Sequence, residues 1–273
     1  MSILELLTKE MKEPMLYSSF ANSWFHYLSL LVTVILVIWS IKYLNKKSVN
    51  DVRKYILVFA LTLIGFELYK QIIFTYQNDW TYPWYIFPFQ FCSIPMYVGL
   101  IIGLSKKQMI YDYGVSFLIT YGLFAGLAVM IYPEQVFIKT IGINIQTMVH
   151  HGGMTVVGLS LLFTRKVELR LKTMFKAAVV FAIVLSAAVI FNFFHNQFIG
   201  TPTFNMFFIN AKYKNHLPIL THIQPLVSDD LFVIIYFLGF SMVSYITFLI
   251  NLIIFKSTRM NMITHGKVTQ KNR

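Results

Sequence analysis

Residues 24–44 read WFHYLSLLVTVILVIWSIKYL, a run with no acidic side chain and a single lysine near its end. A membrane-spanning helix needs roughly 20 mostly apolar residues. Six further segments of this kind follow, and backbone groups in lipid must be hydrogen-bonded within the segment, which favours helices. We therefore predict an all-α, polytopic membrane protein that forms one membrane domain over residues 1–273. Its seven transmembrane helices are expected at about 24–44, 54–75, 84–104, 109–131, 143–164, 175–198 and 230–255.

The composition supports a membrane protein. The chain is 57% hydrophobic and only 12% charged, whereas soluble domains carry about 25% charged residues. Its net charge of +12 suits anionic lipid head groups, so we predict membrane phospholipids and no nucleic acid as partners. The single cysteine provides no disulfide or zinc framework. No metal or cofactor is predicted, and the sequence leaves the oligomeric state open.

The distribution of lysine and arginine predicts the orientation. Seventeen of the 23 basic residues fall in the connections after the first, third and fifth predicted spans and in the C-terminal tail. Five lie on the other side, and Lys70 is inside a span. Because cytoplasmic loops are enriched in basic residues, we expect the N-terminus outside and the C-terminus in the cytoplasm. The predicted location is the cell membrane, most simply a bacterial plasma membrane.

Polar residues within the predicted spans gather at one depth. Glu67, Cys92, His150, His151 and Asn192 all fall in the outer half of their spans. At 1.5 Å per residue, they lie within roughly 12 Å of the outer boundary. Ionisable groups inside a membrane are expensive and mark functional sites by default. The pattern predicts a site that faces the outer leaflet.

Each of these residues also has a purely structural interpretation. A free cysteine such as Cys92 packs as a small hydrophobe. Glu67 and Lys70 are spaced i, i+3 and can form an internal ion pair. Asn192 and Asn196, one turn apart, can serve as interhelical hydrogen-bonding groups.

The connection at 199–229 is long and unusually apolar for a loop. We expect it to lie in the membrane interface or to re-enter the bundle as a lid, because irregular backbone at membrane depth must be covered by protein. Asn205 and Lys212 would then lie near the polar cluster, where they could hold a phosphate or sugar head group.

A thiol beside a neutral imidazole can carry out acyl transfer. The histidine takes the thiol proton, the thiolate attacks an ester carbonyl, and the thioester passes the acyl chain to an acceptor. Glu67 could orient the histidine, and asparagine amides could stabilise the oxyanion. Pro95 is expected to interrupt the helical hydrogen bonds near Cys92.

The run Phe87-Pro88-Phe89-Gln90-Phe91-Cys92-Ser93-Ile94 resembles the Leu-Pro-Leu-Gln-Leu-Cys-Ser-Ile signature of the YwaF-like bacterial integral membrane proteins. Glu67, His151 and Asn205 fall in the matching order. That family is related to the transmembrane-protein-164 acyltransferases, which move fatty acyl chains between phospholipids. It also bears a more remote similarity to hydrolases of fatty-acid esters.

The resemblance implies that Cys92 is the acyl-accepting nucleophile and His151 its base, with Glu67, Gln90 and Asn205 in supporting positions. His150 stands where a small residue would be expected, so the choice between the two histidines stays open. We predict a membrane-embedded acyltransferase that uses a phospholipid donor. The alternatives are a lipid ester hydrolase with the same residues, and a small-solute transporter or binding protein.

Overall fold

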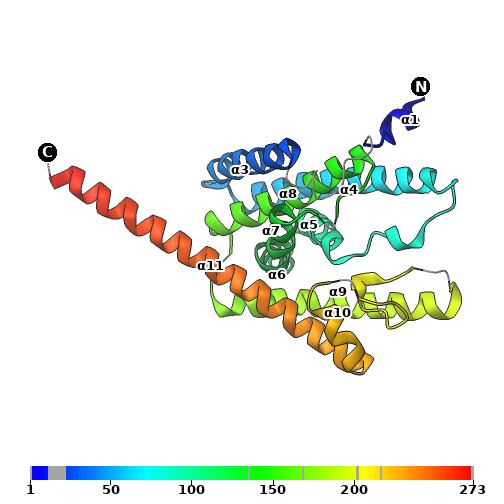
Figure 1. Ribbon diagram of the computed structural model, residues 1–273. Helices are drawn as coiled ribbons and strands as arrows, with labels where there is room; N and C mark the ends of the chain where they lie inside the picture. The colour runs from blue at the N-terminus through cyan, green and yellow to red at the C-terminus, as the bar shows by residue number, and fades with distance from the viewer. Residues whose placement is uncertain are drawn as a thin grey trace.

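The computed structural model of the protein describes residues 2–11, 23–134, 136–167, 169–200, 203–215 and 217–271, with side chains described as far as Ile253. The regular elements in these ranges are all helical, and one isolated β-bridge joins Glu10 to Thr140. A short helix, α1 (Ile3–Leu7), precedes the bundle, and the last helix, α11 (Asp229–Lys271), extends beyond it toward the C-terminus (Figure 1). The predicted all-α fold is confirmed for this part of the chain.

Five helices in the described residues are long and apolar enough to cross a membrane. The third of them is continuous through three elements, α6, a π-helical turn (η3) and α7. The five helices are α3 (Trp24–Leu44), α4 (Val49–Gln77), α6–η3–α7 (Gln108–Phe117, Leu118–Gly122 and Leu123–Ile131), α9 (Leu171–Phe198) and the Asp229–Ile253 part of α11 (Asp229–Lys271).

The other two predicted spans differ from these five. Residues 84–104 form a short 3-10 turn, η1 (Trp84–Ile86), an irregular stretch around Pro88, and then a second turn, η2 (Phe91–Ser93), that leads into α5 (Ile94–Leu104). The helix α8 (Ile141–Phe163) is full-length, but its polar residues lower its hydropathy. The structure therefore supports five spanning helices, and the predicted count of seven is not confirmed.

The α6–η3–α7 helix occupies the centre of the bundle. In its apolar 18-residue stretch 72% of the residues are buried. In the matching stretches of the other four spanning helices only 17–33% are buried. Most of α8 is buried as well, and it packs against α3, α4 and α7. This arrangement keeps the polar side chains of α8 among protein atoms while the outer helices present leucine, isoleucine and valine outward, which is the favourable arrangement in lipid.

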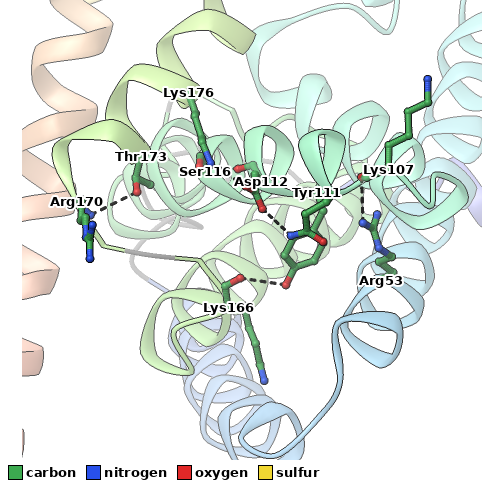
Figure 2. Close-up of polar contacts among 10 residues, drawn as sticks. Arg53, Lys107, Tyr111, Asp112, Ser116, Lys166, Arg170, Thr173 and Lys176 are labelled. Atoms are coloured by element: carbon green, nitrogen blue, oxygen red, sulfur yellow. Dashed lines mark hydrogen bonds and ion pairs between the residues drawn. The ribbon is translucent and has the colours of Figure 1, made fainter.

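The loops at 45–48, 105–107 and 164–167 meet at one end of the bundle, which we call the basic end. Figure 2 shows the contacts of Arg53 with Lys107 and of Tyr111 with Lys166 at this end. The Arg53 guanidinium donates to the carbonyl oxygens of Ser105, at 2.7 Å, and Lys107, at 3.1 Å. The Tyr111 hydroxyl donates to the carbonyl of Lys166 at 3.1 Å. These bonds join connections that are rich in lysine and arginine, which the charge pattern predicts to lie on the cytoplasmic side of the membrane.

Candidate functional site

Cys92 lies in η2, immediately before α5, and its side chain is half-buried. Pro88 and the extended Gln90 precede it, so the regular helix begins only at Ile94. Pro95 occupies the first turn of α5, where a missing N–H breaks no hydrogen bond. The expectation that Pro95 interrupts a helix is therefore wrong, because it stabilises a helix start.

His150 is the histidine that contacts the Cys92 residue. Its Nε2 lies 2.9 Å from the Cys92 carbonyl oxygen. A carbonyl can only accept, so Nε2 carries the proton and Nδ1 is the basic nitrogen. That Nδ1 is buried and has no hydrogen-bond partner. Buried polar atoms are nearly always paired, so this unpartnered nitrogen calls for an explanation other than packing.

His151 binds its own helix instead. Its Nδ1 donates to the Thr147 carbonyl at 2.9 Å, which leaves Nε2 as the basic nitrogen. Its backbone lies against α7, since a Cβ added to Gly126 would come within 2.9 Å of the His151 carbonyl oxygen. The two histidine rings are 5.4 Å apart. Both imidazoles are therefore in one region, but they extend from different faces of α8.

Glu67 contributes a buried carboxylate from α4. Its Oε1 accepts from the Lys70 ammonium at 2.8 Å and from the Gln71 amide at 2.6 Å. The ion pair that the i, i+3 spacing predicts is confirmed. The other oxygen, Oε2, is buried without a partner. Glu67 and Lys70 are also near enough to interact electrostatically with Cys92, so the pair belongs to the surroundings of the thiol.

Gln71 and Tyr82 extend this network toward the end of the bundle opposite the basic end. The Gln71 amide also donates to the Ile86 carbonyl at 2.8 Å, and its oxygen accepts from the Tyr82 hydroxyl at 2.7 Å. Burial and the charge of Glu67 raise the pKa of Tyr82 to about 12, so the phenol stays protonated and donates. Neither residue was among the predicted site residues, although Gln71 follows Glu67 by one helical turn.

Gln90 binds the 203–215 segment through both ends of its amide. Its Nε2 donates to the Asn205 carbonyl and its Oε1 accepts from the Phe207 N–H, each at 2.9 Å. Asn192, on α9, binds the same segment and both donates to and accepts from the Met206 backbone, at 3.0 and 2.8 Å. Two side chains thus bind three consecutive residues of the connection.

The other predicted polar residues of this connection stabilise its own structure. The side-chain oxygen of Asn205 accepts from the Asn210 N–H at 2.8 Å, and Asn210 pairs with Asn196 of α9. The exposed Lys212 places its ammonium 3.4 Å from the Asn196 carbonyl. These contacts give Asn205 and Asn196 structural roles, and Lys212 lies at the surface.

Phe207 anchors the connection in the bundle. It is fully buried and contacts the rings of Phe91 and Phe181, with centroids 5.9 and 6.4 Å away. Its φ of 58° is rare for a bulky residue and indicates local strain. No sequence motif signals this conformation. Because Phe91 precedes Cys92, the connection packs directly beside the residue that carries the thiol.

In the described part of the chain, no three side chains of His, Cys, Asp or Glu are grouped closely enough to hold a metal ion. What the bundle contains is a cysteine, two histidines and a carboxylate surrounded by apolar helices. This combination defines a multi-pass membrane protein with an internal polar site.

The chain belongs to the TMEM164 family, whose model matches residues 19–252. The match includes every residue of the polar site described above. No curated protein and no solved structure is significantly similar to the chain.

Proposed function

We propose that the protein is a membrane-embedded acyltransferase with Cys92 as its nucleophile. The observation that carries this proposal is the pair of buried, unpartnered polar atoms near the cysteine, His150 Nδ1 and Glu67 Oε2. Burying a polar atom without a partner destabilises a fold, and each such group in a native protein calls for an explanation, a catalytic role among them. The resemblance around the 87–94 run and membership of the TMEM164 family support the same chemistry.

The proposed reaction has two balanced steps. His150 takes the thiol proton, and the Cys92 thiolate attacks the ester carbonyl of a phospholipid. The carbon–oxygen bond breaks, the lysophospholipid leaves with the proton from the histidine, and the acyl group stays on sulfur as a thioester. A hydroxyl of the acceptor lipid then loses its proton to the histidine and attacks the thioester, which restores the thiol. In this proposal Glu67, whose charge acts on Cys92, would help to offset the positive charge that the histidine gains in each step.

Two alternatives use the same residues differently. A lipid ester hydrolase would transfer the acyl group to water, and it would release fatty acid instead of a new acyl lipid. A transporter would use Glu67, Lys70 and the histidines to line a solute or proton path. The closed 2.8 Å ion pair between Glu67 and Lys70 argues against an open path.

The membrane arrangement is part of the proposal. We infer that α5 and α8 cross the bilayer with the five apolar helices, which makes seven spans. The N-terminus then lies outside, the basic end lies in the cytoplasm, and the thiol faces the outer leaflet of a plasma membrane. We further place the chain in the YwaF-like bacterial branch on the strength of the 87–94 run.

Replacing the thiol tests the proposal directly. Cys92→Ala should abolish acyl exchange between phospholipids, measured by lipidomics of cells that produce either protein and by exchange in vesicles that contain purified protein. Cys92→Ser should also lose most activity, because a serine hydroxyl is far less readily ionised. Undiminished exchange by a folded Cys92→Ala protein would refute the nucleophile, and fatty acid release without a new acyl lipid would favour the hydrolase.

A further inference from the structure

A polar cavity of about 510 Å³ opens at the basic end, between α6, the loop after α8 and the start of α9. It lies at the other end of the bundle from Cys92 and the 203–215 segment, so it is separate from the proposed acyl-transfer site. Five of its lining residues are basic and one is acidic. The cavity is lined by Gln108, Asp112, Arg165, Lys166, Val167, Arg170, Lys172, Thr173 and Lys176.

The acidic residue does not neutralise this surplus. One oxygen of Asp112 binds the Lys176 ammonium at 2.8 Å, and the other accepts from the Gln108 amide at 2.7 Å. Glu168, in the same loop, lies outside the described residues. Even with its charge included, the cavity carries a surplus of positive charge. An anion in the cavity would be attracted by several cations at once.

Arg165 occupies a backbone position that glycine usually fills. Its N–H binds the Leu162 carbonyl at 3.2 Å, and the next N–H, from Lys166, binds the Leu161 carbonyl at 3.1 Å. This pair of bonds is the Schellman motif that ends many helices, and its left-handed residue is most often glycine. Arg165 has φ 52°. An arginine there is conformationally unfavourable, so a role of its side chain in the cavity would explain its presence.

The start of α9 adds to the positive potential. The first N–H groups of a helix have no partner within it, and the helix dipole is positive at that end. Acidic residues are favoured there, yet the first turn of α9 has none, and Arg170 and Lys172 line the cavity at this point. Burial also lowers the pKa of Lys166. A bound anion would offset each of these unfavourable features.

We propose that this cavity binds the phosphate group of an anionic phospholipid. A phosphate matches the geometry of arginine side chains and helix N-termini, and basic pockets between membrane helices on the cytoplasmic side bind such head groups. The basic end is where the surrounding leaflet would present them. The inference depends on the position of these residues at the membrane surface and is independent of the acyl-transfer chemistry.

Lipid retention by purified protein tests the site. The wild type in neutral detergent is titrated with phosphatidylglycerol or phosphatidylcholine, and bound lipid is counted by native mass spectrometry. Lys172→Gln should weaken phosphatidylglycerol binding about fivefold, since one basic residue near an anionic lipid contributes roughly 1 kcal/mol. The control is Lys106→Gln, which removes an exposed charge at the same end but outside the cavity. Equal losses in both variants would reduce the effect to general surface charge and overturn the proposal.

Two further arms separate the remaining explanations. Arg165→Gly should raise the unfolding temperature in lipid-free detergent, because the strain is relieved, and yet weaken phosphatidylglycerol binding. Unchanged binding in that variant would overturn the assignment of its side chain to the cavity. Inorganic phosphate or glycerol 3-phosphate should not displace the lipid at equal concentration. Displacement would assign the cavity to a soluble phosphate and overturn the lipid as its ligand.

Discussion

The two adjacent histidines of α8 differ in the atom that each leaves free. Both donate one ring N–H to a backbone carbonyl, His150 to Cys92 and His151 to Thr147. The free nitrogen is therefore Nδ1 in His150 and Nε2 in His151. Only His150 is joined by a hydrogen bond to the residue that carries the thiol. This geometry assigns the proposed base to His150, whereas the family resemblance implies His151.

Replacing each histidine with glutamine distinguishes these assignments. In His150→Gln the new amide can still donate to the Cys92 carbonyl, but the basic nitrogen is lost. We expect acyl exchange to fall about 10²–10⁴-fold, the usual contribution of a positioned general base, with little change in unfolding temperature. His26→Gln is the matched control, since His26 binds the Met130 carbonyl at 2.8 Å in the same way. A larger loss in His151→Gln than in His150→Gln would return the role to His151.

The sequence could predict that these groups lie near one another, because the depths of Cys92, Glu67 and His150 follow from counting residues along the spans. It could not predict which histidine faces the cysteine. Adjacent residues on a helix point about 100° apart, and the rotation of α8 depends on close contacts such as that of Gly126 with the His151 backbone. Such contacts involve residues that are distant in the sequence and leave no local pattern.

At the scale of elements, the connection between α9 and α11 is part of the bundle. Its later part forms two short helices, α10 (Leu220–Ile223) and η5 (Gln224–Leu226). The described stretch 203–215 forms only a short 3-10 turn, η4 (Met206–Phe208), so side chains must satisfy its buried backbone. Gln90 and Asn192 do so, and Phe207 fills the space above Phe91. We propose that the connection, which packs against Phe91, is a lid beside the cysteine and that the two amide side chains hold it in place.

Removing one of these amides should loosen the connection. Gln90→Ala leaves the Asn205 carbonyl and the Phe207 N–H without partners, and each buried unsatisfied group costs about 1–3 kcal/mol. We expect faster hydrogen exchange at 203–210, measured by mass spectrometry in detergent, and a lower unfolding temperature. The control is Asn251→Ala, because Asn251 is buried but bonds only within its own helix, to Thr247. Unaltered exchange at 203–210 would show that Gln90 does not hold the connection.

The same elements show where sequence reasoning reaches its limit. The apolar run at 84–104 predicts a continuous helix by composition alone. Pro88 and the hydrogen bonds of Gln90 to the 203–215 segment keep residues 87–90 out of a helix. The long connection is recognisable as buried from its apolar residues. The hydrogen bonds that Gln90 and Asn192 make to it, and the positive φ of Phe207, arise from tertiary packing, which no local propensity encodes.

For the whole molecule, the charge pattern and the hydrogen bonds agree on which connections share an end. Arg53 of α4 binds the 105–107 loop, and Lys166 donates to the Lys47 carbonyl at 3.0 Å. At the opposite end, the Gln77 amide binds the Thr140 hydroxyl at 2.9 Å. These alternating connections are what we expect if, as proposed, α5 and α8 cross the membrane together with the five apolar helices. Of the seven proposed spans α5 is the shortest, and α8 is not among the helices that are apolar enough to cross by composition.

Cysteine labelling can test this orientation, because Cys92 is the only cysteine in the chain. In a Cys92→Ser background, Thr81→Cys introduces a thiol in an exposed loop at the end opposite the basic end, and Lys106→Cys introduces one in an exposed loop at the basic end. A membrane-impermeant maleimide added to intact cells should label the first and not the second, and both should react after lysis. Both positions are exposed, so a difference in labelling between the two variants reports the side of the membrane and not a difference in accessibility. Labelling of Lys106→Cys alone in intact cells would invert the orientation and place the proposed thiol site, with its lid, in the cytoplasmic leaflet.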